Sequence, residues 1–274
     1  MPIHATAVVD PISEIADTAI IGPYTVIEGR VRVGSGTQVG PHVHLLGDTD
    51  IGRDCVIHAG AVIGDLPQDR SYRGGISFCR IGDGTLIREH VTIHRGSASE
   101  SATTVGSRCL IMAGAHIGHN CVVADEVVLV NGALLGGYVE VGCKALISGN
   151  VGIHQFVRVG ELAIIGSASK IVQDMLPYFM IDGPGYCVGI NRVGMRRAGL
   201  QSSDIEEAKQ AFQILCRRPG SLATALEALR LTIRNEVGSR ILEFLTGPSR
   251  RGFHLHPSHR FSRKSDRPNL ISDD

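Results

Sequence analysis

A six-residue repeat of branched apolar residues runs from position 3 to position 171 of this chain. Of the 29 positions on this grid, only Asp69, Gly75 and Ser99 are not apolar. A period of six suits neither a helix, at about 3.6 residues per turn, nor a simple alternating strand. It fits short strands joined by tight turns, and hexapeptide repeats are a signature of the parallel β-helix. We therefore predict a solenoid whose core contains Ile3, Val9, Ile15, Ile21, Ile27, Val33, Val39, Leu45, Ile51, Ile57, Ile63, Ile81, Ile87, Ile93, Val105, Ile111, Ile117, Val123, Leu129, Leu135, Val141, Ile147, Ile153, Val159, Ile165 and Ile171.

Two gaps interrupt the repeat without changing its phase. If three strands of six residues make one coil, each coil takes about 18 residues. The repeat stops after Ile63 and resumes at Ile81, and it stops again after Ile93 and resumes at Val105. Both gaps are multiples of six, so we expect loops that leave one corner while the coil continues. Loops that project from a rigid scaffold are common places for binding residues.

The C-terminal third has a different pattern. Residues 178–191 are expected to be extended and irregular, and helices are expected over 203–218, 221–236 and 240–245. Ser203 and Glu206 have the spacing of a capping box at the first helix. We predict a β-helix domain over 1–185, a small α-helical domain over 186–253 and a disordered tail over 254–274, which is polar and lacks periodicity.

Charge and composition exclude several classes of protein. The chain has no net charge, but residues 1–191 hold 12 Lys and Arg against 18 Asp and Glu, whereas residues 192–274 hold 15 against 9. A basic C-terminal part could attract an acidic partner, and no nucleic-acid partner is expected. No leader or membrane-spanning apolar run is present, which predicts a cytoplasmic protein without a transmembrane segment. The seven cysteines form no CxxC pair, so neither a disulfide framework nor a zinc knuckle is indicated.

One column of the predicted solenoid has the residues for acyl transfer. His119, Gly137 and Gln155 are spaced so that they stack in successive coils. An imidazole above a glycine combines a general base with a backbone N–H that can approach a developing oxyanion. The alternative is that this histidine is only a hydrogen-bonded polar group. His58 and His94 also share a column, but no spacing supports a metal site.

Several segments resemble one known family, the UDP-N-acetylglucosamine O-acyltransferases of lipid A biosynthesis. They are Gln68-Asp69, IREHVTIHRG over 87–96, HIGH over 116–119, GIHQF over 152–156 and GMRRAG over 194–199. The similarity covers about residues 1–253, and this combination of motifs is specific within hexapeptide-repeat proteins. It implies an all-β left-handed parallel β-helix with a small C-terminal α-helical domain.

The resemblance also implies an activity and its residues. It implies transfer of an R-3-hydroxyacyl chain from acyl carrier protein to the 3-hydroxyl of UDP-GlcNAc, the first step of lipid A biosynthesis. The acyl donor is carried on phosphopantetheine, and no other cofactor is implied. The enzyme is expected to be a homotrimer with sites between adjacent β-helices. His119 matches the general base and Gly137 the oxyanion donor. Ser167 matches a position that sets acyl-chain length. The substrate-binding positions of the family are matched by Gln68, Asp69, His94, His116, Gln155, Asn191 and Arg197.

Four positions depart from the family pattern. Asn120 stands where an Asp usually follows the base, Tyr138 where a His is usual, Ser71 where a Lys is common, and Val193 where a Glu is usual. An amide can orient an imidazole but cannot stabilise an imidazolium by charge. An alternative function is therefore N-acylation of a 3-amino UDP-sugar, because an amine needs a weaker base than a hydroxyl. Two further alternatives are a metal-dependent enzyme on the same solenoid and a trimeric scaffold without activity.

Overall fold

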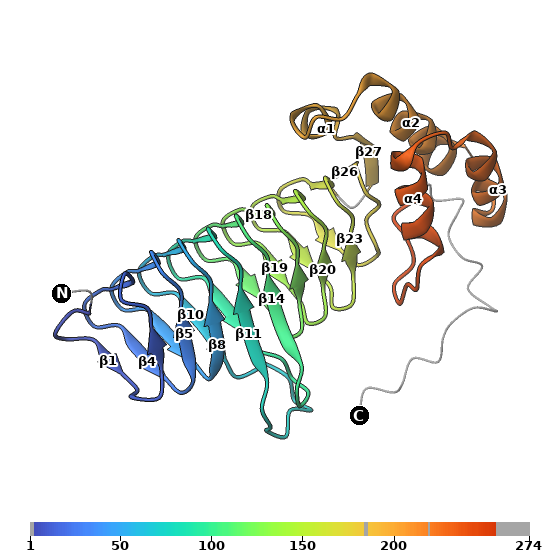
Figure 1. The fold of residues 1–274 in the computed structure, drawn as a ribbon. Helices are drawn as coiled ribbons and strands as arrows, with labels where there is room; N and C mark the ends of the chain where they lie inside the picture. The colour runs from blue at the N-terminus through green and yellow to red at the C-terminus, as the bar shows by residue number, and fades with distance from the viewer. Residues whose placement is uncertain (1–2, 184–185, 219, 256–274) are drawn as a thin grey trace.

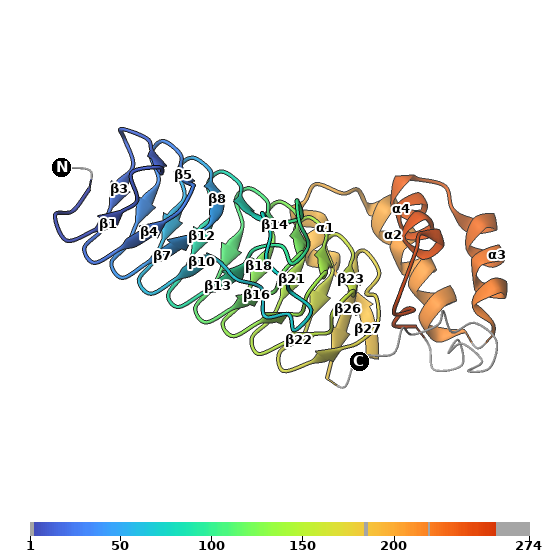
Figure 2. The ribbon, with the colours of Figure 1, turned by 90° about the horizontal axis from the view of Figure 1, so that it is seen from below.

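The computed structural model describes residues 3–183, 186–218 and 220–255. Three sheets of very short strands form the faces of a triangular prism, and each turn of the chain adds one strand to each face (Figure 1). All pairings between successive coils are parallel, and they confirm the predicted left-handed β-helix. The N-terminus lies at one end of the prism and the helices pack at the other (Figures 1 and 2).

The three sheets are named here for the order in which the chain first reaches them. Sheet 1 contains β1 (Val8–Val9), β4 (Val26–Glu28), β7 (His44–Leu46), β10 (Val62–Asp65), β13 (Thr92–His94), β16 (His116–Ile117), β19 (Leu134–Leu135), β22 (Gly152–Ile153) and β25 (Lys170–Ile171). Sheet 2 contains β2 (Glu14–Ile15), β5 (Val31–Val33), β8 (Asp48–Ile51), β11 (Phe78–Ile81), β14 (Ala102–Val105), β17 (Val122–Val123), β20 (Glu140–Val141) and β23 (Arg158–Val159). Sheet 3 contains β3 (Ile20–Ile21), β6 (Gln38–Val39), β9 (Val56–Ile57), β12 (Leu86–Ile87), β15 (Leu110–Ile111), β18 (Val128–Leu129), β21 (Leu146–Ile147), β24 (Ile164–Ile165), β26 (Phe179–Asp182) and β27 (Tyr186–Ile190).

From Ile21 onward the residues of the six-residue repeat fill the inside of the prism. At the N-terminal end the prediction is wrong for Ile3, which is 37% exposed, and Val9 and Ile15 are only half-buried, because the end coil is packed against a neighbouring coil on one side only. Ile57, Ile111 and Ile147 are at most 1% exposed. Burying a side chain of this size stabilises the fold by about 1.5–3 kcal/mol.

Buried threonines lie two residues before several repeat positions, and the hydroxyls of Thr25, Thr37 and Thr85 each donate to a carbonyl of the next coil. The Thr37 hydroxyl, for example, donates to the Gly52 carbonyl at 2.8 Å.

Two loops leave the prism at the corner between sheets 1 and 2, as the gaps in the repeat predict. The first loop joins β10 to β11 and the second joins β13 to β14. The repeat keeps its phase across both, because Ile63 pairs with Ile93 and Ile93 pairs with Ile117. A register shift after Ile63 brings Asp65 opposite His94. Such bulges re-aim the side chains beside them.

The C-terminal part adds a strand pair and helices to the last coil. The extended segment that the sequence predicts after 177 forms β26 and β27, which pair antiparallel. The helical elements are α1 (Arg192–Arg197), α2 (Ser202–Phe212), the π-helical turn η1 (Gln213–Arg217), α3 (Leu222–Thr232) and α4 (Glu236–Thr246). The expected C-terminal helices are present, but α1 was not predicted.

The helix ends differ from the sequence-based prediction. The cap of α2 is Gln201 rather than Ser203, and its backbone N–H donates to the Asp204 carboxylate at 2.8 Å. The next helix ends at Thr232, and α4 begins at Glu236 instead of 240. The reason is Asn235, whose side-chain oxygen accepts hydrogen bonds from the Val237 and Gly238 N–H groups and so starts a new helix there.

A buried ion pair attaches α4 to the last coil. The Arg158 guanidinium donates to Asp174 at 2.8 Å, and the Asp174 carboxylate is fully buried. The same guanidinium donates to the Phe244 carbonyl and lies 4.3 Å from the centre of the Phe244 ring. A second ion pair joins Arg240 to Glu161 at 2.7 Å. These contacts position the helical part against the end of the prism.

The expected tail over 254–274 begins two residues too early. His254 is buried, its backbone N–H donates to the Asp174 carbonyl, and its own carbonyl accepts from the Cys187 thiol. These contacts hold residues 254 and 255 against the end of the prism. The sequence could not predict them, because this segment has no periodic pattern. The remainder of the expected tail, from residue 256, lies outside the described residues.

Candidate active site

His119 lies in the turn after β16, at the corner where both loops leave the prism. The residue that follows it, Asn120, has a φ of 60°, and the equivalent turn residues in the next two coils, Tyr138 and Phe156, have φ values of 60° and 66°. Asparagine tolerates this left-handed conformation better than most residues. The tight turn repeats in these three coils, so His119, Gly137 and Gln155 stack as the spacing predicts. The Tyr138 N–H donates to the His119 carbonyl, and the Phe156 N–H donates to the Gly137 carbonyl.

A hollow of about 660 Å³ opens beside this column on the outer face of sheet 1. Polar and apolar groups of five successive coils and of the first loop surround it. Its lining consists of Gln68, His94, His116, Gly118, His119, Leu134, Leu135, Gly136, Gly137, Gly152, Ile153, His154, Gln155, Lys170 and Ile171.

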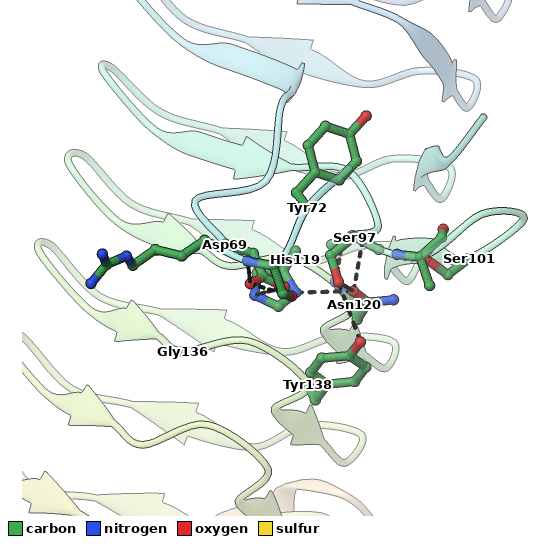
Figure 3. Close-up of polar contacts among 12 residues, drawn as sticks. Asp69, Tyr72, Ser97, Ser101, His119, Asn120, Gly136 and Tyr138 are labelled. Carbon is green, nitrogen blue, oxygen red and sulfur yellow. Dashed lines mark hydrogen bonds and ion pairs between the residues drawn. The ribbon is translucent and has the colours of Figure 1, made fainter. Parts of the chain in front are cut away.

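The two ring nitrogens of His119 face different groups (Figure 3). Nδ1 is 3.0 Å from the Asn120 side-chain oxygen, and Nε2 is 3.9 Å from a carboxylate oxygen of Asp69. The His119 side chain is only 12% exposed. The Tyr138 ring packs edge-on against the imidazole, with 5.3 Å between ring centres. The imidazole is therefore held on three sides, with Nε2 on the side of the hollow and the first loop.

Glycine at position 137 leaves room for the His119 ring. A Cβ atom there would lie 2.6 Å from both Cε1 and Nε2 of His119, closer than real Cβ contacts come. Among the described residues, no group accepts a hydrogen bond from the Gly137 N–H. The site therefore offers a free backbone donor directly beside the imidazole, the arrangement that an oxyanion hole requires.

Two of the other histidines of the hollow, His116 and His94, are held neutral by burial. Desolvation lowers the pKa of His116 to about 4, and nearby His94 and His119 contribute in the same direction. Desolvation also lowers the pKa of His94, against a smaller opposing effect of Asp65. The Thr92 hydroxyl lies 2.8 Å from His116 Nδ1, and the His94 and His116 rings pack edge to face. At neutral pH neither ring adds positive charge beside His119.

Asp69 is held in its charged form by its own loop. The Ser71 hydroxyl and the Ser71 N–H donate to one carboxylate oxygen at 2.7 and 2.8 Å, and these bonds lower the pKa of Asp69. Weaker contributions in the same direction come from His119 and Ser97. Around His119 the site thus combines one carboxylate, the two neutral histidines His94 and His116, and a free backbone N–H.

The structure brings most of the predicted site residues together, but not all of them. Gln68, His94, His116 and Gln155 line the hollow, and Asp69 flanks His119. Three predicted residues lie outside the hollow, namely Asn191, Arg197 and Ser167.

These three residues have separate surroundings. Asn191 caps α1: its amide nitrogen donates to the Leu162 carbonyl and its oxygen accepts from the Gly194 N–H, at 2.8 Å each. Arg197 is exposed on the last turn of α1, and Ser167 is exposed in the turn between β24 and β25. Within one chain, none of the three residues lines the hollow, so their predicted roles toward a ligand there are not supported by a contact in this structure.

One column of the hollow was missed, although the repeat contains the signal for it. Leu134, Gly152 and Lys170 follow His116 on the outer face of sheet 1, where β16, β19, β22 and β25 pair in register. The same spacing that identified the His119 column would have identified this one. Gly152 leaves open space, because a Cβ atom there would touch nothing within 4 Å.

Further contacts at this corner come from two parts of the chain without periodicity. Ser97, in the second loop, donates to Asn120, and Arg251 donates from Nε to the Gln155 carbonyl at 2.9 Å. The Arg250 guanidinium lies 4.5 Å from the centre of the Phe156 ring. No sequence pattern indicates these contacts, because neither segment repeats.

No group of three or more His, Cys, Asp or Glu side chains in residues 3–183, 186–218 and 220–255 is arranged to hold a metal ion. Within the same ranges, no helix is long and apolar enough to cross a membrane.

Sequence and structure comparisons match this architecture. The family profile described as "Udp N-acetylglucosamine O-acyltransferase; Domain 2" matches residues 174–254, and that of the bacterial transferase hexapeptide matches 30–65 and 102–137. The acyl-[acyl-carrier-protein]–UDP-N-acetylglucosamine O-acyltransferase of Syntrophobacter fumaroxidans is 40% identical over 92% of this chain and 99% of its own. The enzyme of that name from Gloeothece citriformis is 41% identical over 74% of each chain.

Solved structures give the same result. The UDP-N-acetylglucosamine acyltransferase of Francisella novicida superposes with a TM-score of 0.89 at 37% identity, over 93% of this chain and 94% of the other. The UDP-N-acetylglucosamine O-acyltransferase of Moraxella catarrhalis also has a TM-score of 0.89, at 36% identity, over 93% of this chain and all of the other. Fold, site and relatives agree, and this chain belongs to the UDP-N-acetylglucosamine O-acyltransferase family.

Proposed function

We propose that this protein is an acyltransferase that moves an R-3-hydroxyacyl chain from acyl carrier protein to the 3-hydroxyl of UDP-GlcNAc, the first step of lipid A biosynthesis. The observation that carries this proposal is the imidazole of His119 directly above the free N–H of Gly137. Family membership supplies the substrates, because the relatives are named for acyl carrier protein and UDP-N-acetylglucosamine.

In the proposed reaction, His119 acts as general base. Its Nε2 removes the proton from the 3-hydroxyl while that oxygen attacks the thioester carbonyl. The carbonyl oxygen becomes an oxyanion and accepts a hydrogen bond from the Gly137 N–H. The intermediate then collapses: the C–S bond breaks, the ester forms, and the imidazolium returns its proton to the pantetheine thiolate. No redox change or further cofactor is needed, since the donor carries its own phosphopantetheine.

A homotrimer is part of the proposal. Asn191 and Arg197 lie outside the hollow of their own chain, so a role toward the nucleotide requires α1 of a neighbouring chain beside it. Arg197 is exposed and could form bidentate hydrogen bonds with a diphosphate. A measured mass in solution of three chains would support this arrangement, and a monomer would contradict it. We place the reaction in the cytoplasm, which fractionation of cells would test.

A second candidate function has one specific observation in its favour. Asn120 carries no charge, so the residue bonded to Nδ1 gives the imidazolium no ionic stabilisation. An amine acceptor would tolerate a weaker base than a hydroxyl. N-acylation of a 3-amino UDP-sugar is therefore the alternative, although the relatives are named as O-acyltransferases.

A paired assay separates the two functions. Purified protein is supplied with a 3-hydroxyacyl carrier protein and either UDP-GlcNAc or its 3-amino analogue. Faster turnover of UDP-GlcNAc supports the ester-forming function. A strong preference for the amine supports the alternative, and turnover of neither contradicts both. Varying the acyl length in wild type and Ser167→Gly tests the proposed role of Ser167, which fails if the preference does not move.

A further inference from the structure

The groups around the His119 ring differ in charge from one side to the other. Asn120, at Nδ1, is neutral, and Asp69, 3.9 Å from Nε2, is a carboxylate. The remaining groups facing the ring are the imidazoles of His94 and His116, both neutral at pH 7, and the ring of Tyr138. Among the described residues, Asp69 is the one carboxylate within ion-pair distance of His119.

The orientation of the Asn120 amide is fixed from outside by the second loop. Its side-chain oxygen accepts two hydrogen bonds from Ser97, one from the backbone N–H at 2.9 Å and one from the hydroxyl at 3.0 Å (Figure 3). A backbone N–H can only donate, so the atom facing it must be the oxygen and not the amide nitrogen. The Ser97 hydroxyl also lies 3.3 Å from the Tyr138 hydroxyl, which joins this loop to the next coil.

The orientation of the amide determines which nitrogen of His119 carries the proton. The Asn120 oxygen that lies 3.0 Å from Nδ1 is an acceptor, so Nδ1 must be the protonated nitrogen of the neutral ring. Nε2 then has the free lone pair, on the side of Asp69 and the hollow. Once Nε2 takes a proton, the resulting N–H is beside a charged carboxylate and not beside the neutral amide.

We propose that two separate residues replace a single acidic partner of the base. Ser97, acting through Asn120, is a positioning residue that fixes the Nδ1–H form of His119, and Asp69 supplies the counter-charge for the imidazolium from the opposite side of the ring. Ser71 keeps that carboxylate charged and aimed, through two hydrogen bonds. This inference rests on the proposed function only in naming the imidazolium as an intermediate; the protonation state of the resting ring is independent of it.

The first test measures the tautomer without turnover. The protein, labelled with ¹⁵N in its histidines, gives ring nitrogen shifts that distinguish Nδ1–H from Nε2–H, and the spectrum of His119→Gln identifies the signals of this residue. We expect Nδ1–H in the wild type at neutral pH. An Nε2–H ring in the wild type would overturn the proposal, whatever the variants do.

Variants of Asn120 separate positioning from simple packing. Asn120→Asp keeps the acceptor and tolerates the left-handed backbone, so the Nδ1–H form is expected to persist. Asn120→Ala removes the acceptor, and the ring is expected to show a mixture of both forms. A ring that stays fully Nδ1–H in Asn120→Ala would contradict the role of the Ser97–Asn120 contact.

The second test measures the counter-charge by titration of the same ring signals and by the pH dependence of kcat/KM. Removing a carboxylate near an imidazole disfavours its protonated form, so Asp69→Asn is expected to move the protonation midpoint to lower pH. Asn120→Asp adds a carboxylate and is expected to move it to higher pH. Asp83→Asn, which removes an exposed carboxylate paired with Arg53, is the matched control.

The outcomes distinguish this inference from the proposed function. A midpoint that Asp69→Asn leaves unchanged overturns the counter-charge. A protein that transfers no acyl chain to either acceptor overturns the proposed function, while the ring signals still report the tautomer and the midpoint.

Discussion

The inside of the prism and the corner between sheets 1 and 2 are built from the same coils but are determined differently. Inside, every coil presents the same kind of residue, and Ile57, Ile111 and Leu129 occupy equivalent buried positions. At the corner, successive coils present His119, Gly137 and Gln155, which have no chemistry in common. The stability of the interior is shared among many similar buried residues, whereas each corner residue has its own function. A repeat can therefore be regular and still carry one specific site.

The largest effect is expected at the corner. His119→Ala removes the proposed general base, so turnover should fall by about 10²- to 10⁴-fold, with the thermal midpoint little changed. A steady-state assay with UDP-GlcNAc checks this, and His58→Ala, a half-exposed histidine paired with Glu89, is the control. If turnover fell less than tenfold in His119→Ala, the comparison would fail, because the corner would then tolerate substitution as well as the surface does.

The next effect is expected inside the prism, on stability and not on chemistry. Leu129 is fully buried in β18, and Leu129→Ala should lower the free energy of unfolding by about 2–5 kcal/mol. Leu134→Ala is the matched control, because Leu134 is 49% exposed on the outer face, and its loss should cost less than about 1 kcal/mol. Denaturant unfolding measures both. Equal losses at the two positions would show that the repeat does not define the core.

Gly137→Ala tests whether the corner needs a particular glycine. The added methyl group would displace the His119 ring, because Cβ would lie 2.6 Å from Nε2, and turnover should fall by about 10²-fold. Gly189→Ala is the control, since a Cβ atom at Gly189 meets nothing within 4 Å. Near-normal turnover in Gly137→Ala would show that the imidazole can shift without loss.

The smallest effect expected is a pH dependence of stability from the hollow. The pKa of His116 is about 4 in the folded protein, below the ordinary value of 6.5. The unfolded chain therefore takes up the proton first, and stability is fully present above about pH 6.5 and is lost as the pH falls toward 4. His116→Gln should reduce this loss in the free energy of unfolding between pH 6.5 and 4 by about 1–2 kcal/mol. Thermal melts at several pH values measure the slope; an unchanged slope would mean that His116 is not desolvated.

Part of the site could be predicted because it lies within the repeat. His119 and Gly137 occupy equivalent turn positions in uninterrupted coils, so a fixed spacing was enough to stack them. The residues that hold His119 in place are different. Ser97 and Asp69 come from the two loops, and no spacing indicates that a loop folds back over the coil that follows it.

The helical part shows the same limit in another form. Helices could be expected from composition and apolar pattern, but their ends could not, because several polar residues compete for the same free N–H groups. Gln201 and Asp204 rather than Ser203 begin α2, and Asn235 begins α4. Asn191 matched a nucleotide-binding position, yet in this chain both ends of its amide are bonded within the fold.

The sequence by itself determined the prism, the corner from which the loops leave, and the stacking of an imidazole over a glycine. It could do so because a parallel β-helix converts a distance along the chain directly into a position in space. Only the tertiary structure decided which nitrogen of His119 faces the carboxylate, which loop holds Asn120, and where the helices attach. Those outcomes depend on contacts between segments that share no period, and the hydrogen bonds that select them exist only once the chain has folded.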